Sequence, residues 1–286
     1  NVIFSAYTSG NQVIATNTST GVISSTTPVT GAIGLVYVAS TGEVWAFGST
    51  AGTIYRFTSA GFYIGSTAVT SLTASCRGIH DDSTGTGNVY AYNGVTMNII
   101  NASTYARTGV ALAGSGSGSY EMAHVSGGAQ SGLLVGCLTS GIFGFNISTN
   151  TVAYFLSALT HNTYIKYVPS LDVLITSSNA THSIKYYTPT TSTTLTLANT
   201  ISGVLTPYQF EIDETEDRIY AFSAAPALSP MRMYVFVLST VAWVKSIILP
   251  TLTTSSGTFC CQDISNKTIY AVGTANGGSI AKIVYG

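Results

Sequence analysis

Short apolar strands with an aromatic residue near the centre recur along the chain. The clearest copies are residues 44–47 (VWAF), 89–92 (VYAY) and 219–222 (IYAF), and weaker copies start at Val2, Leu133, Val173 and Ile269. Their starts lie roughly 40–50 residues apart, and self-similarity at one nearly constant length indicates a repeat architecture. The chain is therefore expected to contain about seven copies of one structural unit.

Each copy also keeps one internal order of polar and apolar positions. In the second copy, residues 52–57 alternate as a strand does, residues 58–61 (TSAG) form a polar turn, and residues 62–65 begin another strand. Gly, Asn and Ser at such turns supply left-handed backbone and local hydrogen bonds, which is typical of hairpins. One more strand, closed by an acidic or polar turn, precedes the aromatic strand, as in residues 210–220. The pattern predicts four antiparallel strands per unit.

A four-stranded unit of this length is the blade of a β-propeller. We predict an all-β chain that forms a single seven-bladed β-propeller domain over residues 1–286, with four-stranded antiparallel blades and incomplete first and last blades. The first blade is expected to lack its first strand and the last blade its fourth. A pair of β-sandwiches or a β-solenoid fits less well, because neither repeats at this length. The expected repeats span about 1–30, 31–72, 73–116, 117–160, 161–204, 205–254 and 255–286.

Two segments carry a resemblance to known propeller families. Residues 79–90, with IHDD before NVY, and residues 212–220, with ID before RIY, are similar to the YVTN/lactonase-like and NHL-like repeat types. The resemblance concerns the order of strands and turns over essentially the whole chain, and it implies the propeller fold. Propellers of these types include enzymes, binding platforms and cell-surface proteins, so the function stays open.

The composition is unusual for its low charge. Charged residues make up 7% of the chain and the net charge is −1, whereas about 25% charged residues is typical. Abundant Ser and Thr take their place, which favours a location outside cells or at the cell surface. Without a basic surface the chain is not expected to bind nucleic acid. No apolar run reaches the roughly 18 residues of a membrane span.

Propeller ligands usually bind at the axial channel, beside the starts of the first strands. A lactonase-like hydrolase would need several carboxylates that converge there on a divalent ion. Glu121 is the one acid at these positions, and Arg77 is the second weak catalytic candidate. We therefore expect no metal and no cofactor, and a non-enzymatic protein rather than an enzyme. The expected channel positions are Arg77, Tyr120, Glu121, Tyr164, Tyr208, Gln209 and Phe259.

Other polar groups have simple structural explanations. The acidic residues 213–217 (DETED) fall in a turn and are expected to be solvated, with a calcium site as the alternative. The segment His80-Asp81-Asp82 has the same placement and the same explanation. His124 and His161 are each expected to stand alone, because no second ligand follows at metal-binding spacing.

The four cysteines are too few for a fold built on disulfides. Cys260 and Cys261 are adjacent, and adjacent cysteines can form a strained vicinal disulfide. In a strand, however, successive side chains point to opposite faces of the sheet. The alternative is therefore two separate thiols, one of them buried.

Five sequons are candidates for N-linked glycosylation, namely Asn17, Asn101, Asn146, Asn179 and Asn266. Chance alone predicts roughly four in a chain so rich in Ser and Thr, so their positions are more informative than their number. Three of them, Asn17, Asn101 and Asn146, fall in the turn between the third and fourth strands of a repeat. Asn266 is expected on the same face, and Asn179 on the other.

These observations predict an extracellular, non-enzymatic structural or recognition module that carries N-linked glycans and assembles into a larger polymer. The alternatives are a secreted lactonase-like hydrolase that uses the axial channel, and a lectin-like carbohydrate binder. Self-association is expected through residues 1–30 and 258–286, where incomplete blades would leave strand edges unpaired.

Overall fold

The computed structural model describes residues 2–7, 11–112, 118–159, 163–223, 230–253, 258–273 and 280–286. They form β-strands and two short 3₁₀ helices, η1 (Asp82–Thr84) and η2 (Gly128–Gln130). No helix in these ranges is long and apolar enough to cross a membrane. The chain packs as two compact units, each described by itself below. Unit 1 comprises Asn1–His124 and Leu133–Ala158, and unit 2 comprises Val125–Gly132 and Leu159–Gly286.

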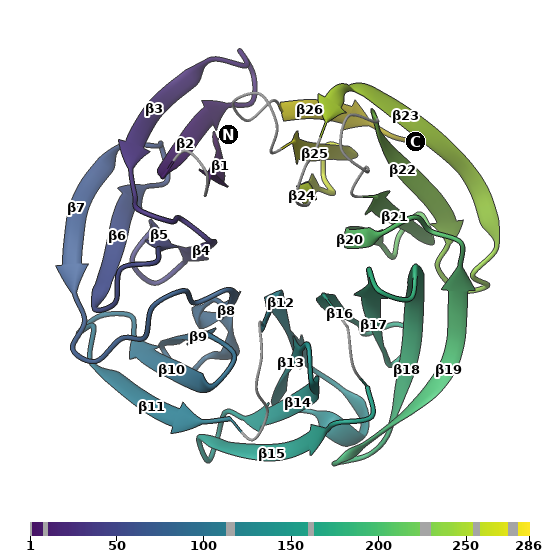
Figure 1. Ribbon diagram of the computed structural model, residues 1–286, viewed down its shortest axis with the longest axis horizontal. Helices are drawn as coiled ribbons and strands as arrows, with labels where there is room; N and C mark the ends of the chain where they lie inside the picture. Colours follow the sequence, from purple (N-terminus) through teal and green to yellow (C-terminus); the bar gives the residue numbers. More distant parts are fainter. Residues whose placement is uncertain are drawn as a thin grey trace. The chain divides into compact units, whose positions relative to one another are not determined.

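The sheets of unit 1 follow one another along the chain (Figure 1). The first has the order β1 (Val2–Tyr7), β2 (Gln12–Asn17), β3 (Ile23–Pro28). The second has the order β4 (Gly34–Val38), β5 (Glu43–Phe47), β6 (Thr53–Thr58), β7 (Tyr63–Ala68). An eight-stranded sheet then has the order β11-β10-β9-β8-β12-β13-β14-β15. Its strands are β8 (Gly78–His80), β9 (Asn88–Tyr92), β10 (Thr96–Asn101), β11 (Arg107–Ala111), β12 (Gly118–Val125), β13 (Leu133–Leu138), β14 (Gly141–Asn146) and β15 (Thr151–Leu156).

The eight-stranded sheet consists of two four-stranded halves, β8–β11 and β12–β15. Strands β8 and β12 run parallel and meet through the residue pair Ile79 and Glu121. Antiparallel hairpins join consecutive strands within each half, as in β9 with β10 and β13 with β14. The parallel contact thus connects two consecutive repeats within unit 1.

Unit 2 continues the same pattern with three antiparallel sheets. The first has the order β16 (Tyr164–Val168), β17 (Val173–Ser178), β18 (Ser183–Thr191), β19 (Thr194–Ser202). The second has the order β20 (Pro207–Asp213), β21 (Arg218–Ser223), β22 (Pro230–Val237), β23 (Trp243–Thr253). The last has the order β24 (Thr258–Asp263), β25 (Thr268–Gly273), β26 (Ile280–Val284).

The aromatic strands predicted from the repeat are confirmed as β1, β5, β9, β13, β17, β21 and β25. Nearly every residue of β9, β13 and β17 is buried, on both faces of the sheet. A strand buried on both faces is continuously apolar instead of alternating. This burial explains why the repeat is visible in the sequence.

The hydrophobic core lies between consecutive sheets. In unit 1, Trp45 of β5 shares a cluster with Ile79 and Ile100 of the next sheet. In unit 2, Tyr186 of β18 shares a cluster with Phe210 of β20. Within each unit, consecutive sheets therefore bury apolar faces against each other, as stacked repeats do.

One glycine shows how closely the strands of unit 1 approach each other. A Cβ atom on Gly78 of β8 would overlap the ring of Tyr92, its partner in β9. The hydroxyl of Tyr92 then donates a buried hydrogen bond of 2.6 Å to the carbonyl of Cys137 in β13. Gly78 is needed because its missing side chain leaves room for a ring that links two halves of the sheet.

Most of the hairpins that end the sheets contain the left-handed backbone predicted from the sequence. We call these the closing hairpins: β2–β3, β6–β7, β10–β11 and β14–β15 in unit 1, and β18–β19 and β22–β23 in unit 2. Left-handed backbone occurs in their turns at Gly21, Gly61, Tyr105, Asn150 and Val241. Asn and Gly adopt this conformation most readily.

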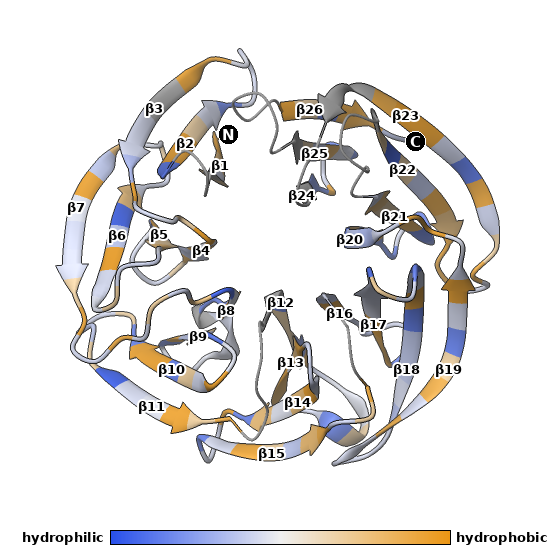
Figure 2. Ribbon diagram, in the orientation of Figure 1, coloured by the Kyte–Doolittle hydropathy of each residue, from blue (hydrophilic) through white to orange (hydrophobic). Residues whose placement is uncertain are grey.

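The strands that end the closing hairpins, β3, β7, β11, β15, β19 and β23, are called the last strands below. They are the most exposed strands of their sheets, as the pattern of β7 shows. Figure 2 shows mostly white and orange residues along β3 and β7, because these strands consist of hydroxyl, small and apolar residues.

Candidate functional site

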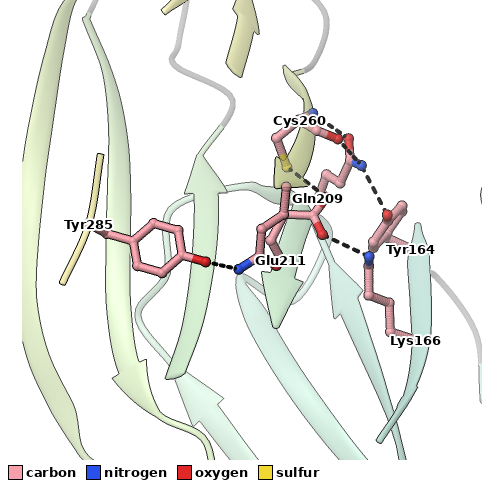
Figure 3. Close-up of polar contacts among 7 residues, drawn as sticks. Tyr164, Lys166, Gln209, Glu211, Cys260 and Tyr285 are labelled. Carbon is pink, nitrogen blue, oxygen red and sulfur yellow. Dashed lines mark hydrogen bonds and ion pairs between the residues drawn. The ribbon is translucent and has the colours of Figure 1, made fainter. Parts of the chain in front are cut away.

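The first strands of the unit 2 sheets, β16, β20 and β24, bring polar side chains close together (Figure 3). Alternate residues of a strand share one face, so each strand contributes a pair two residues apart. Contacts among these side chains join consecutive sheets of unit 2. The pairs are Tyr164 and Lys166 on β16, Gln209 and Glu211 on β20, and Cys260 and Gln262 on β24.

An ion pair forms the centre of this cluster. Lys166 Nζ lies 2.8 Å from Glu211 Oε2, and the exposed fractions of the two side chains are 25% and 6%. The Lys166 ammonium also lies 5.7 Å from the centre of the Tyr164 ring. A carboxylate so well buried requires a partner charge. The pair therefore holds β16 against β20.

Gln209 extends the connection to the third sheet. Its side-chain amide donates to the hydroxyl of Tyr164 at 2.9 Å and to the carbonyl of Cys260 at 2.8 Å. Its Oε1 accepts from the backbone N–H of Cys260 at 2.8 Å. One side chain thus satisfies both backbone groups of a residue in β24, much as a neighbouring strand would. Of the expected channel positions, the structure brings Tyr164 and Gln209 together.

Both cysteines of β24 are free thiols, so the vicinal disulfide allowed by the sequence is not present. The reason is the extended strand, which directs successive side chains to opposite faces. Cys260 is buried and its Sγ lies 3.6 Å from Glu211 Oε1, whereas Cys261 is exposed. Burial, with the nearby Glu211 carboxylate, raises the pKa of Cys260 well above its usual value. A thiol in that state is a poor nucleophile.

The acidic turn after β20 is not simply solvated, contrary to expectation. Asp213 is buried, and its two oxygens accept from the N–H groups of Thr215 and Glu216 and from the hydroxyl of Tyr285. The other acids bond elsewhere in unit 2: Glu214 to Ser170, Glu216 to Lys267, and Asp217 to Ser239. These acidic side chains therefore stabilise the turn and connect it to other parts of unit 2.

In unit 1 the two weak catalytic candidates come to neighbouring strands. Glu121 on β12 pairs with Ile79, and Arg77 precedes β8 by one residue. His80 and His124 lie on the same two strands, with ring centres 5.8 Å apart in an edge-to-face contact. The prediction that His124 stands alone is therefore wrong, because a parallel contact between distant strands brings it to His80. His161 lies outside the described residues.

Electrostatics favour the neutral form of His124. Burial, followed by the nearby His80, lowers the pKa of His124, and Asp81 opposes this in part. His80 Nδ1 in turn lies 3.1 Å from the carbonyl of Asp81 and 3.4 Å from its carboxylate. Among the described residues, no group of three or more His, Cys, Asp or Glu side chains is arranged to hold a metal ion.

Sequence reasoning missed one polar cluster of unit 1. Glu43 forms an ion pair with Arg56 and accepts from the indole N–H of Trp45 at 3.0 Å. The Arg56 guanidinium lies 5.1 Å from the ring centre of Tyr105, which also packs on Trp45. Hydrogen bonding to Arg56 lowers the pKa of Glu43. Arg56 of β6 is paired with Trp45 of β5, and Glu43 lies two residues before Trp45 on the same face, so the strand register predicted from the repeat would have brought Glu43 and Arg56 together.

The five sequons lie in turns, and none of their asparagines is buried. Asn17, Asn101 and Asn146 are the last residues of β2, β10 and β14, at the closing hairpins. Asn179 lies in the turn between β17 and β18, and Asn266 in the turn between β24 and β25. Among the expected channel positions, the carbonyl of Tyr208 accepts from the Ser177 hydroxyl at 2.8 Å, and the side chains of Tyr120 and Phe259 are outside the described set.

Comparisons with known proteins identify the fold. No family model matches the chain, and no curated protein sequence matches it either. A hydrazine synthase chain from Kuenenia stuttgartiensis matches with a TM-score of 0.75 and 11% identity, over 99% of this chain and 92% of that one.

Two further structures match with a TM-score of 0.67. A functionally unknown protein from Desulfotomaculum acetoxidans shares 11% identity over 100% of both chains. The β-propeller domain of Cps50 (Swd1) from Myceliophteria thermophila shares 10% identity, over 99% of this chain and 97% of that one. At such identities the likeness shows the fold alone: the chain has the β-propeller repeat fold, with several four-stranded antiparallel sheets.

Proposed function

We propose that this chain is a non-enzymatic, seven-bladed β-propeller that works outside cells as a structural or recognition module and assembles with further copies of itself. The observation that carries the proposal is the composition of the last strands. Strands β3, β7, β15 and β19 contain no charged residue. Strands β11 and β23 contain one each, Arg107 and Lys245.

Charged side chains are the usual protection of a sheet edge against pairing with another chain. Each last strand stands at the end of its sheet, so its outer edge has no partner strand among the described residues. Apolar side chains are exposed beside these edges. Ile64 of β7 is 45% exposed, and Trp243 and Ile248 of β23 are 64% and 48% exposed. Edges of this composition suit strand addition by a second copy.

The low net charge of the chain also supports self-association. Copies of a chain with a net charge of −1 repel one another weakly. Strands β3 and β26 lie within the segments 1–30 and 258–286 that the sequence favoured for self-association. The low charge and high Ser and Thr content support a place outside cells.

The sheet order among the described residues supports the proposed number of blades. When the halves β8–β11 and β12–β15 are taken separately, the sheets number seven: two of three strands and five of four. A density map that resolves seven sheets around one axis is the expected outcome. Fewer than seven would overturn this part of the proposal.

Self-association is tested by measuring the mass of the purified protein over a range of concentrations. We expect oligomers that grow with concentration, and a shift to monomer when Ile64→Lys and Ile248→Lys place a charge on two last strands. Leu171→Lys is the matched control, because Leu171 is also exposed (39%) but lies in a turn outside the last strands. A wild-type chain that stays monomeric at every concentration would contradict the proposal.

A hydrolase is the second candidate, because Glu121, His80 and His124 lie on the paired strands β8 and β12, and Arg77 directly precedes β8. A neutral histidine is able to act as a general base. The test is hydrolysis of a panel of lactones and esters by the wild-type protein. Turnover that is lost in both Glu121→Gln and His124→Gln would place this candidate above the structural one.

A further inference from the structure

Three closing hairpins of unit 1 are built around an asparagine in the same position. Asn17 Oδ1 accepts from the N–H groups of Ser19 and Thr20, at 2.9 and 3.1 Å. Asn101 Oδ1 accepts from the N–H groups of Ser103 and Thr104, at 3.1 and 2.9 Å. Each asparagine thus mimics a backbone turn with its own side chain.

The third hairpin repeats the arrangement. Asn146 Oδ1 accepts from the N–H groups of Ser148 and Thr149, at 2.9 and 3.2 Å. In all three hairpins the hydrogen bonds use the side-chain oxygen, and the two residues that donate to it are exposed. The side-chain nitrogen, Nδ2, makes no hydrogen bond to any other residue that the structure describes. The amide oxygen Oδ1 is hydrogen-bonded within the turn, while the amide nitrogen Nδ2 is available to another partner.

Turn formation alone does not require asparagine at such a position. Aspartate makes the same contacts in two other turns of the protein, where Asp213 accepts from Thr215 and Glu216, and Asp263 from Asn266. The fourth closing hairpin of unit 1 uses Thr58, whose hydroxyl accepts from the N–H of Phe62 at 3.1 Å. The three asparagine hairpins differ from these turns in carrying an amide nitrogen, and each has a serine two residues later, as the Asp263 turn also does.

We propose that Asn17, Asn101 and Asn146 are acceptors of N-linked glycans, so that unit 1 carries sugar on three equivalent hairpins. The inference rests on the extracellular placement proposed above, because the modification requires a secretory route. The donor is a lipid-pyrophosphate-linked oligosaccharide. A bond forms between Asn Nδ2 and C1 of the sugar, the bond from C1 to the pyrophosphate oxygen breaks, and Nδ2 gives up one proton.

The two sequons of unit 2 differ in geometry. Asn266 Nδ2 donates to Asp263 Oδ2 at 2.8 Å, so its amide nitrogen is turned back onto the protein. In the sequon of Asn179, the Thr181 hydroxyl is bonded to Ser183 Oγ at 2.7 Å. The proposal therefore assigns glycans to the three hairpins of unit 1 and none to Asn179 and Asn266.

The experiment is to express the full chain through the secretory pathway of a eukaryotic cell and to map glycopeptides by mass spectrometry in both secreted and retained protein. We expect glycan at Asn17, Asn101 and Asn146, and bare peptide at Asn179 and Asn266. Each of Asn17→Asp, Asn101→Asp and Asn146→Asp should remove one glycan and preserve the turn.

A gain of modification provides the converse test. Thr58→Asn combined with Ala60→Thr installs a sequon in the fourth closing hairpin and should add one glycan. Bare peptide at the three native asparagines, or equal occupancy at Asn266, would overturn the proposal. The mass of the unglycosylated protein at high concentration tests self-association separately, so the failure of one idea is distinguishable from the failure of the other.

Discussion

The contacts between first strands differ in the two units. In unit 2, Lys166, Glu211 and Gln209 join three sheets through a buried ion pair and a side-chain amide. In unit 1, β8 meets β12 through a parallel pair and the two rings of His80 and His124. The first arrangement brings opposite charges together. The second packs two imidazole rings edge to face, and burial lowers the pKa of His124.

The comparison shows that one repeat can join its sheets by different chemistry. The apolar clusters between sheets are alike in kind in both units. The polar contacts between first strands differ: unit 2 uses an ion pair and a side-chain amide, and unit 1 uses two histidine rings. Variants at these contacts should therefore change the free energy of unfolding by different amounts in the two units. The pH dependence of the change should also differ.

The largest effect is expected for Lys166→Met in unit 2. It leaves the Glu211 carboxylate, 6% exposed, without its ammonium partner. Breaking a buried pair costs roughly 3–5 kcal/mol, and we expect about 2–3 kcal/mol here because Lys166 is itself partly exposed. The measurement is the free energy of unfolding from urea titration at neutral pH. A loss well under 1 kcal/mol would contradict the structural role of the pair.

Tyr92→Phe in unit 1 should have the next largest effect. It removes the buried hydrogen bond of 2.6 Å to the Cys137 carbonyl and leaves the packing of the ring in place. We expect a loss of about 1–2 kcal/mol in the free energy of unfolding, since a buried carbonyl loses its donor. Tyr63→Phe is the control, because Tyr63 is 45% exposed. Equal effects of the two variants would show that the hydrogen bond does not matter.

A smaller effect is expected from pH. The pKa of His124 is below its ordinary value of 6.5 in the folded chain. As the pH falls through about 6.5, the unfolded chain binds a proton that folded His124 does not, so the free energy of unfolding decreases. This decrease continues until the pH reaches the lowered pKa of the folded state.

The pH effect is measured from urea midpoints at about pH 7.5 and about pH 5.5, on either side of the ordinary histidine pKa. His124→Gln should flatten the difference, because glutamine does not titrate. Arg77 and Asp81, just outside β8, and Glu121 on β12 are charged residues close to the histidines in sequence, and they are unchanged in this variant. An unchanged pH dependence in His124→Gln would show that another group is responsible.

The smallest effect is expected for Lys267→Met, also in unit 2. Lys267 and Glu216 form an ion pair like that of Lys166 and Glu211, but the exposed fractions of their side chains are 50% and 35%. Solvent screens such a pair, so its removal should leave the urea midpoint nearly unchanged. A shift as large as that of Lys166→Met would mean that burial does not explain the difference between the two pairs.

The sequence by itself determined the repeat, the antiparallel strands and the turn chemistry. It did so because these features are local: a strand such as Val89–Tyr92 is apolar throughout when both of its faces are buried, and Asn or Gly marks a left-handed turn. The same local patterns identified Asn17, Asn101 and Asn146 as members of one set. The number of blades, the glycans and the function stay predictions.

Only the tertiary structure decided which side chains meet. Lys166 and Glu211 are 45 residues apart, as are Tyr164 and Gln209, and their contacts depend on how one sheet packs on the next. His80 and His124 meet because β8 and β12 pair in parallel, which no local pattern reveals. The vicinal disulfide was left open by the sequence and is absent because the backbone of β24 is extended. Contacts between repeats involve residues far apart in the chain, and only packing sets their geometry.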